Sequence, residues 1–172
     1  MISRCKIILL AIVIAAATTL GAVMARRGQK PTQVSVSSKT QWIKMLLREL
    51  TNGEQLDDPG SPQHKALKWL TEEDSFELST EDTWDALQRY ALATFFFATG
   101  GHLGDSVGRN WNNTLRFLSA QHVCQWNVNV QYETLSGMTK NHGVSCSVGN
   151  TVDAVVIPEN NVSRSLPSEI GL

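Results

Sequence analysis

The sequence has almost no net charge. Of its 172 residues, 15 are Lys or Arg and 16 are Asp or Glu, so its formal net charge is −1 at pH 7. A protein that attracts nucleic acid or another acidic polymer through its electrostatic field carries a clear excess of basic residues. The near balance of charges therefore argues against a nucleic-acid partner.

The sequence also lacks a recognisable set of catalytic residues. The acidic clusters at 72–74 and 81–82 are typical of solvated charges at helix ends. The glycine-rich stretch from Gly100 to Gly108 has neither the lysine nor the following apolar strand of a phosphate-binding loop. We therefore expect a protein that is not an enzyme and that holds no cofactor.

An uncharged, largely apolar run of 19 residues extends from Ile7 to Ala25, with basic residues on both sides. A helix of this length, at about 1.5 Å per residue, just crosses a hydrocarbon core of roughly 30 Å. Residues 23–25 also resemble the cleavage site of a signal peptide, and a buried core helix is a third interpretation. We assign residues 1–30 to a membrane anchor or signal segment. The protein is then single-pass with its C-terminal part extracellular or, alternatively, secreted.

The residues after this run predict a linker and then a series of helices. Residues 31–60 are typical of a juxtamembrane linker and a short helix. A second helix is expected from Ser61, a typical N-cap, with Pro62 at the first helical position. A third is expected from Ser79 to the glycine pair at Gly100, a typical C-terminal cap. The five tryptophans are expected to be core and interface anchors.

The last part of the chain has the spacing of a leucine-rich repeat, L-x-x-L-x-L-x-x-N-x-L. The positions predicted to form the repeat core and ladder are Val152, Val155, Ile157, Asn160, Val162, Leu166 and Ile170. The first three are expected to turn inward from a short strand. The side-chain amide of Asn160 is expected to bond the backbone of an adjacent coil. We therefore predict a first leucine-rich repeat at 149–172.

A single coil of this type cannot bury its own apolar residues, because about three repeats or more are normally needed for a stable solenoid. We therefore expect the tail to expose an apolar coil end with unpaired strand edges. This expectation favours a fragment of a longer protein. The alternative is a genuine short protein that docks a partner against Ile170 and Leu172.

Five stretches upstream of the repeat add a family resemblance. They are SPQHKALKWL (61–70), LQRYALATFFFATGG (87–101), NW (110–111), FLSAQHVCQW (117–126) and GVSC (143–146). In this order, and followed by the repeat, they resemble the N-terminal capping region of plant-type leucine-rich-repeat proteins, in particular the membrane-tethered, receptor-like sets found in algae. The resemblance covers roughly residues 61–172.

The resemblance implies an α+β fold. An N-terminal transmembrane or signal helix precedes a small helical cap at 61–148 and the start of an α/β leucine-rich-repeat solenoid. In that family the helices and a disulfide of the cap cover the first repeat, and the solenoid recognises peptides, glycans or other proteins. Two features depart from the family pattern. Residues 127–142 are an insertion, interpreted as a surface loop or as an unspliced or misannotated segment, and Arg164 stands where the family has a glycine.

Cys124 and Cys146 are the two cysteines expected to pair, since the third, Cys5, lies beside the apolar run. A disulfide that closes a loop of about 20 residues stabilises a fold by roughly 3 kcal/mol in the loop-closure model, and an exported compartment favours oxidation. Together with His122 and His142, the same thiols could instead bind zinc, although the spacing matches no zinc-finger pattern. The disulfide is the favoured interpretation.

Two sequons, Asn112-Asn113-Thr114 and Asn161-Val162-Ser163, make Asn112 and Asn161 candidate glycosylation sites. Asn161 follows the predicted ladder position, where a glycan could face solvent. Modification at either position requires export, so both candidates depend on the assignment of residues 1–30.

Together these features predict a non-enzymatic, receptor-like leucine-rich-repeat protein that acts outside the cytosol. Its partners are expected to be a protein or peptide ligand on the repeat surface and the membrane around the N-terminal helix. The alternative is a stand-alone, cysteine-bridged adaptor that docks a partner. A zinc-binding module is the third interpretation.

Overall fold

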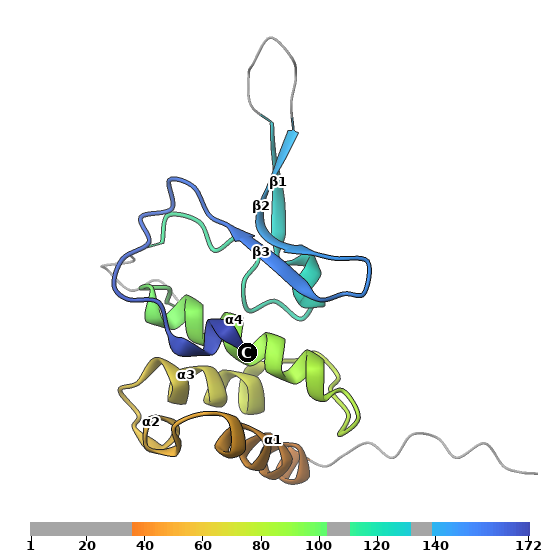
Figure 1. The fold of residues 1–172 in the computed structure, drawn as a ribbon, viewed down its shortest axis with the longest axis vertical. Helices are drawn as coiled ribbons and strands as arrows, with labels where there is room; N and C mark the ends of the chain where they lie inside the picture. Colours follow the sequence, from red (N-terminus) through yellow and green to blue (C-terminus); the bar gives the residue numbers. More distant parts are fainter. Residues whose placement is uncertain (1–35, 103–110, 132–138) are drawn as a thin grey trace, which may run out of the picture. The chain divides into compact units, whose positions relative to one another are not determined.

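The α-helices come first along the described part of the chain, the sheet follows, and a short 3₁₀ helix comes last (Figure 1). The computed structural model describes residues 36–102, 111–131 and 139–172. The helical elements are α1 (Val36–Leu50), α2 (Gly53–Asp57), α3 (Pro62–Lys68), the π-helical turn η1 (Trp69–Glu73), α4 (Thr83–Ala98) and the short 3₁₀ helices η2 (Val123–Gln125) and η3 (Ser168–Gly171). The strands are β1 (Asn127–Gln131), β2 (Thr139–Cys146) and β3 (Val152–Val156).

Helix α3 begins where the sequence predicts a helix start. Ser61 is its N-cap, and the Oγ atom of this serine accepts a hydrogen bond of 2.9 Å from the backbone N–H of His64. Pro62 occupies the first helical position, where its missing N–H costs nothing. The buried Leu67 and Leu70 then pack into the core that α3 and η1 share with α4.

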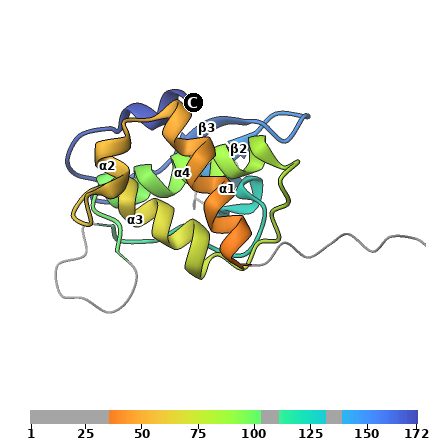
Figure 2. The same cartoon turned by 90° about the horizontal axis from the view of Figure 1, so that it is seen from below.

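Helix α4 lies between the other helices and the sheet (Figure 1, Figure 2). Eleven of its 16 residues are buried, as expected for a helix that is covered on more than one side. It begins at Thr83 rather than at Ser79, because the Asp82 carboxylate accepts hydrogen bonds from the backbone N–H and the hydroxyl of Ser79 in a turn before the helix. Its end matches the prediction, since Gly100 has a left-handed φ of +95°.

Aromatic side chains fill the core next to α4. Trp69, Trp111 and Trp126 are 3%, 5% and 0% exposed. Phe117 links two of them, because its ring centroid lies 5.2 Å from that of Trp111 and 5.5 Å from that of Trp126. The prediction of core anchors is confirmed for these three tryptophans. Trp84 is 47% exposed and is not a core residue.

The three strands form an antiparallel sheet in the order β1-β2-β3. Strand β1 has the alternating sequence NVNVQ, which is typical of a strand with two different faces. β1 and the first part of β2 come from residues 127–142, the segment that the sequence interpretation treated as an insertion. The surface-loop interpretation is therefore wrong, because this segment supplies paired strands.

The structure overturns the predicted solenoid. The fold is α+β, but its sheet has three antiparallel strands, and no solenoid coil occurs within 36–102, 111–131 and 139–172. The predicted repeat strand does form, as β3, yet it pairs with β2 across a turn in which the Ser147 N–H donates to the Thr151 carbonyl at 2.9 Å. A partner one turn away pairs with one edge of β3, whereas a parallel partner needs a longer crossover connection.

The predicted transmembrane or signal helix, from Ile7 to Ala25, lies outside the described residues. Among the helices that are described, none is both long and apolar enough to cross a bilayer. The longest of them is α4, with 16 residues, and a spanning helix needs about 20.

Gly143 allows β2 to lie close to β1. Its φ is +119°, and a Cβ atom built on it would lie 2.2 Å from the carbonyl oxygen of Trp126 and 2.6 Å from the Cα atom of Asn127. Both neighbours are backbone atoms, which cannot move aside without displacing the adjacent strand. Glycine is therefore required at this position for steric and conformational reasons.

Replacing Gly143 with alanine should lower the free energy of unfolding by about 2–4 kcal/mol, because the methyl group overlaps backbone and the left-handed φ strains alanine. Urea unfolding followed by circular dichroism measures this change. Gly149→Ala is the matched control, since a Cβ atom there meets nothing within 4 Å. Equal losses for the two variants would contradict the close approach.

Candidate binding surface

An open cavity of about 450 Å³ lies beside β3. The residues that line it are Phe95, Val152, Asp153, Ala154, Val155, Ile157, Val162, Leu166 and Ile170. We call this cavity the apolar groove, because Asp153 is its one polar lining residue. One wall is β3, and the other is the C-terminal segment, residues 162–170. Phe95 of α4 also contributes to the lining. Six of the seven positions predicted as repeat core and ladder therefore line one surface, and Asn160 is the exception.

The side chains of the apolar groove differ in how far they are covered. Val152, Val155 and Ile157 are partly buried and pack against the core, in agreement with the inward orientation expected for them. On the other wall, Leu166 is 67% exposed, Ile170 is 45% exposed and Val162 is 38% exposed. Contiguous exposure of large apolar side chains is typical of an interaction site.

Strand β3 has a neighbouring strand on one side only within the described part of the chain. The Val144 N–H donates to the carbonyl of Trp126 at 2.8 Å, so the backbone groups of Val144 face β1. Val155 is the β3 partner of Val144. In an antiparallel ladder the N–H and C=O of one residue face the same side. The backbone groups of Val155 therefore face the open edge of β3.

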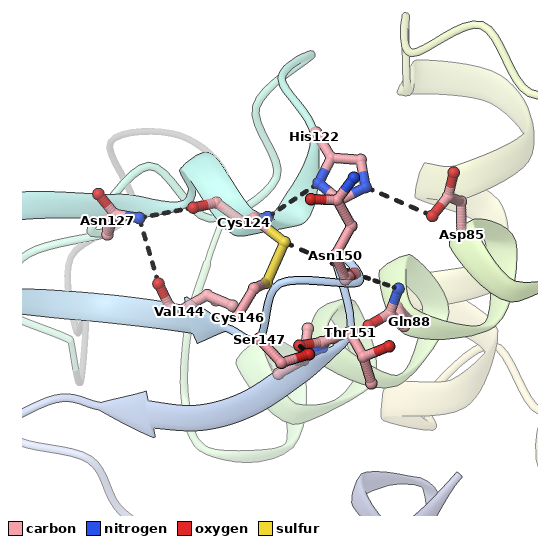
Figure 3. The surroundings of a disulfide bond; sticks show 11 residues. Asp85, Gln88, His122, Cys124, Asn127, Val144, Cys146, Ser147, Asn150 and Thr151 are labelled. Carbon is pink, nitrogen blue, oxygen red and sulfur yellow. Dashed lines mark hydrogen bonds and ion pairs between the residues drawn. A yellow bond between two sulfur atoms is a disulfide. The ribbon is translucent and has the colours of Figure 1, made fainter.

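Gln88 of α4 bonds the turn before β3 (Figure 3) and also the first residue of β3. Its Oε1 atom accepts a hydrogen bond of 2.7 Å from the Val152 N–H, and its Nε2 atom donates to the Asn150 carbonyl at 3.3 Å. Gln88 is only 7% exposed, so these bonds form where water competes weakly. One side chain thus fixes the end of the β2–β3 turn against the central helix.

The disulfide predicted between Cys124 and Cys146 is present in the structure (Figure 3). It joins η2 to the end of β2, with a Cα–Cα distance of 5.5 Å. Asn127 reinforces the same junction, because its Nδ2 atom donates to the carbonyl of Cys124 at 2.7 Å and to that of Val144 at 3.1 Å. The base of the β1–β2 hairpin is therefore held both covalently and by hydrogen bonds.

The alternative zinc site is not formed. Both thiols that it requires are in the disulfide. Within the described ranges, no three residues of the types His, Cys, Asp and Glu come together to hold a metal ion. His122 instead accepts a hydrogen bond of 3.2 Å at Nδ1 from the Cys124 N–H, and its Nε2 atom lies 3.4 Å from Oδ1 of Asp85. This histidine connects η2 to α4.

Asn160, the predicted ladder asparagine, is 4% exposed. Its Nδ2 atom donates to the carbonyl of Asn113, and its Oδ1 atom accepts from the N–H of Asn113, both at 2.7 Å. The amide therefore bonds the backbone of another segment, as expected for its type. That segment is the stretch that begins at Trp111, not an adjacent repeat coil.

Both sequon asparagines, Asn112 and Asn161, are exposed. The Nδ2 atom of Asn112 donates to the carbonyl of Glu159 at 2.9 Å. Asn161 has a left-handed φ of +52°, which asparagine tolerates better than most residues. Glycosylation at either site stays a prediction.

A buried ion pair that the sequence did not predict joins Arg89 of α4 to Asp74, the residue after η1. The guanidinium group of Arg89 donates to Asp74 from Nε at 2.7 Å and from Nη2 at 2.5 Å, and the two side chains are 1% and 0% exposed. Asp74 belongs to the acidic cluster that was interpreted as solvated, so that interpretation is wrong for this residue. Burial lowers the pKa of the nearby Lys39, and the charge of Asp74 opposes this shift.

Two further N–H groups of Arg89 donate to backbone carbonyls. Nη1 donates to Gln121 at 2.7 Å and Nη2 donates to Ser119 at 3.0 Å. Three aromatic rings surround the guanidinium carbon, which lies 4.4 Å from the ring centroid of Phe76, 5.0 Å from that of Trp126 and 5.3 Å from that of Trp69. The charge is thus both paired and shielded from water.

No known protein family, curated protein or solved structure matches this chain. The resemblance to leucine-rich-repeat caps rests on the sequence stretches quoted for it and stays a prediction.

Replacing Arg89 with methionine should lower the free energy of unfolding by about 3–5 kcal/mol, because Asp74 is left buried without its partner. Adding Asp74→Leu should restore part of this loss, so that the two changes are non-additive by about 1 kcal/mol or more. Denaturant unfolding of the four proteins in this mutant cycle measures the coupling. Arg48→Met breaks an ion pair whose side chains are 55% and 66% exposed and should cost about 1 kcal/mol or less. If the changes in the free energy of unfolding for Arg89→Met and Asp74→Leu were strictly additive, this result would contradict the buried ion pair.

Arg164→Gly should raise stability by about 0.5–1 kcal/mol. Arg164 has a φ of +77°, a conformation that strains a residue with a Cβ atom, and this strain outweighs the entropy cost of glycine. The leucine-rich-repeat pattern has glycine at this position, and glycine adopts a left-handed φ without strain. The thermal unfolding midpoint reports the change. Ser165→Gly is the control and should be neutral or destabilising, since Ser165 has no left-handed φ; stabilisation by both variants would reject the explanation.

Proposed function

We propose that the protein is a non-enzymatic recognition module that binds a protein or peptide through the apolar groove. The observation that carries this proposal is the contiguous apolar wall formed by Val162, Leu166 and Ile170, which stays exposed while β3 opposite to it packs against the core. Solvent exposure of this wall is unfavourable, and binding of an apolar partner segment removes it from water.

The composition of the groove supports binding rather than catalysis. Asp153 is the one titratable residue among those that line it. General acid–base or nucleophilic catalysis needs a reactive group together with a second group that activates it. A single carboxylate among apolar side chains suits selection of a partner by shape and charge.

The proposed site of action is outside the cytosol, with the chain tethered to a membrane or secreted. The Cys124–Cys146 disulfide supports an oxidising compartment. The apolar run from Ile7 to Ala25 supports export, as an anchor or as a cleaved signal. The receptor-like protein and the stand-alone adaptor are both compatible with this surface and place it in the same compartment.

The test is selection of peptides from a random displayed library against the full chain. Peptides that bind through the groove should lose affinity about tenfold or more, which corresponds to about 1.4 kcal/mol, for Leu166→Lys. Biolayer interferometry measures the loss. Leu166 is 67% exposed, so the substitution should leave the fold intact.

Val148→Lys is the matched control. Val148 is an exposed apolar residue, 106% exposed in the turn between β2 and β3, and it does not line the groove. Selected peptides should bind this variant as they bind the unaltered chain. Peptides that bind equally to both variants would place recognition elsewhere and reject the proposal.

A further inference from the structure

The open edge of β3 and the apolar groove adjoin, and we infer that together they take one extended segment of another protein, which adds a strand to the sheet. This inference rests on the proposed function and specifies the form of the partner. It concerns β3, which has one neighbouring strand in the described part of the chain.

The backbone groups at the open edge of β3 favour an extended partner. The N–H and C=O groups of Val155 face the open edge, because Val144 across the ladder turns its own groups toward β1. An exposed strand edge is a template for pairing with another extended chain. A helix laid into the groove would leave these backbone groups without partners, since its own N–H and C=O groups are bonded internally.

The groove supplies the side-chain part of the recognition. It adjoins the open edge, since Val155 lines the cavity on β3, and Leu166 and Ile170 form the opposite wall. In an added strand, alternate side chains point to the same face. Alternate apolar residues of the partner would therefore enter the groove while its backbone pairs with β3, which is the general pattern of strand addition.

The charge of Asp153 favours a different protein, rather than a second copy of this chain, as the partner. Asp153 lines the groove, and strand β3 has the sequence VDAVV, without a basic residue. Two β3 edges paired with each other would cover the Asp153 carboxylates and offer them no cation, which is unfavourable. The partner segment is therefore one with apolar residues at alternate positions and a Lys or Arg beside Asp153.

The probe is the tightest-binding peptide selected from the random library, tested with single N-methyl groups on successive backbone amides. Methylation of every second amide should weaken binding about tenfold or more, and methylation of the amides between them should have a much smaller effect. Asp153→Lys should weaken binding of a peptide with a basic residue by a similar factor, and Asp153→Asn by less. Isothermal titration calorimetry measures each affinity.

Three outcomes would overturn strand addition. One is a peptide whose affinity depends on Leu166 but does not alternate as successive amides are N-methylated. This outcome leaves the proposed function intact. A second is a concentration-dependent dimer in sedimentation equilibrium that Leu166→Lys abolishes, which assigns the groove to a second copy. The third is a failure of every selected peptide to depend on Leu166, which rejects the proposed function as well.

Discussion

The ion pair between Arg89 and Asp74 constrains most of the described structure. Both side chains are almost fully removed from water, and burial of two charges costs several kcal/mol per ion unless the geometry is good and the other donors are satisfied. The carbonyl groups of Ser119 and Gln121, which lie just before η2, accept two further hydrogen bonds from Arg89. Any arrangement that shifts α4, the end of η1 or this loop leaves a buried donor or acceptor without a partner. The ion pair thus fixes where the sheet starts relative to the helices.

Helix α4 transmits this constraint to the candidate binding surface. Gln88, adjacent to Arg89 in the sequence, holds the first residue of β3 and the turn before it. Phe95 lies seven residues after Gln88, which places both on the same side of an α-helix, and it lines the apolar groove. The strand and the lining next to it therefore depend on one helix. This common support explains how a groove with a partly exposed wall can keep a defined shape.

The sequence predicted those features that depend on neighbouring residues. The start of α3 at Ser61, the left-handed Gly100 after α4 and the strand at Val152 all follow from local rules for caps and periodicity. The pairing of Cys124 with Cys146 followed from their number and the expected compartment.

Features that depend on residues distant in the sequence were either missed or predicted wrongly from the sequence. Asp74 lies in an acidic cluster, and only its contact with a residue 15 positions away distinguishes it from the solvated Glu72 and Glu73 beside it. The spacing of residues 152–162 does not determine which strand pairs with β3. The repeat pattern therefore predicted a solenoid, whereas β3 pairs with β2 in an antiparallel sheet. Six of the nine residues that line the groove were predicted individually as repeat positions, whereas Phe95, Asp153 and Ala154 were not. The position of the groove beside an open antiparallel edge required the structure.

The Cys124–Cys146 disulfide has a mechanical consequence. The bond spans 22 positions of the sequence, so tension applied between the two ends of the chain passes through the sulfur atoms and bypasses the β1–β2 hairpin. The covalent chain of the hairpin between the two cysteines is therefore not stretched in such a pull. The force reaches β3 directly, and this five-residue strand is held by its bonds to β2 and by Gln88. In a chain tethered at one end and bound near the other, the bond therefore limits how far the segment between Cys124 and Cys146 can be extended.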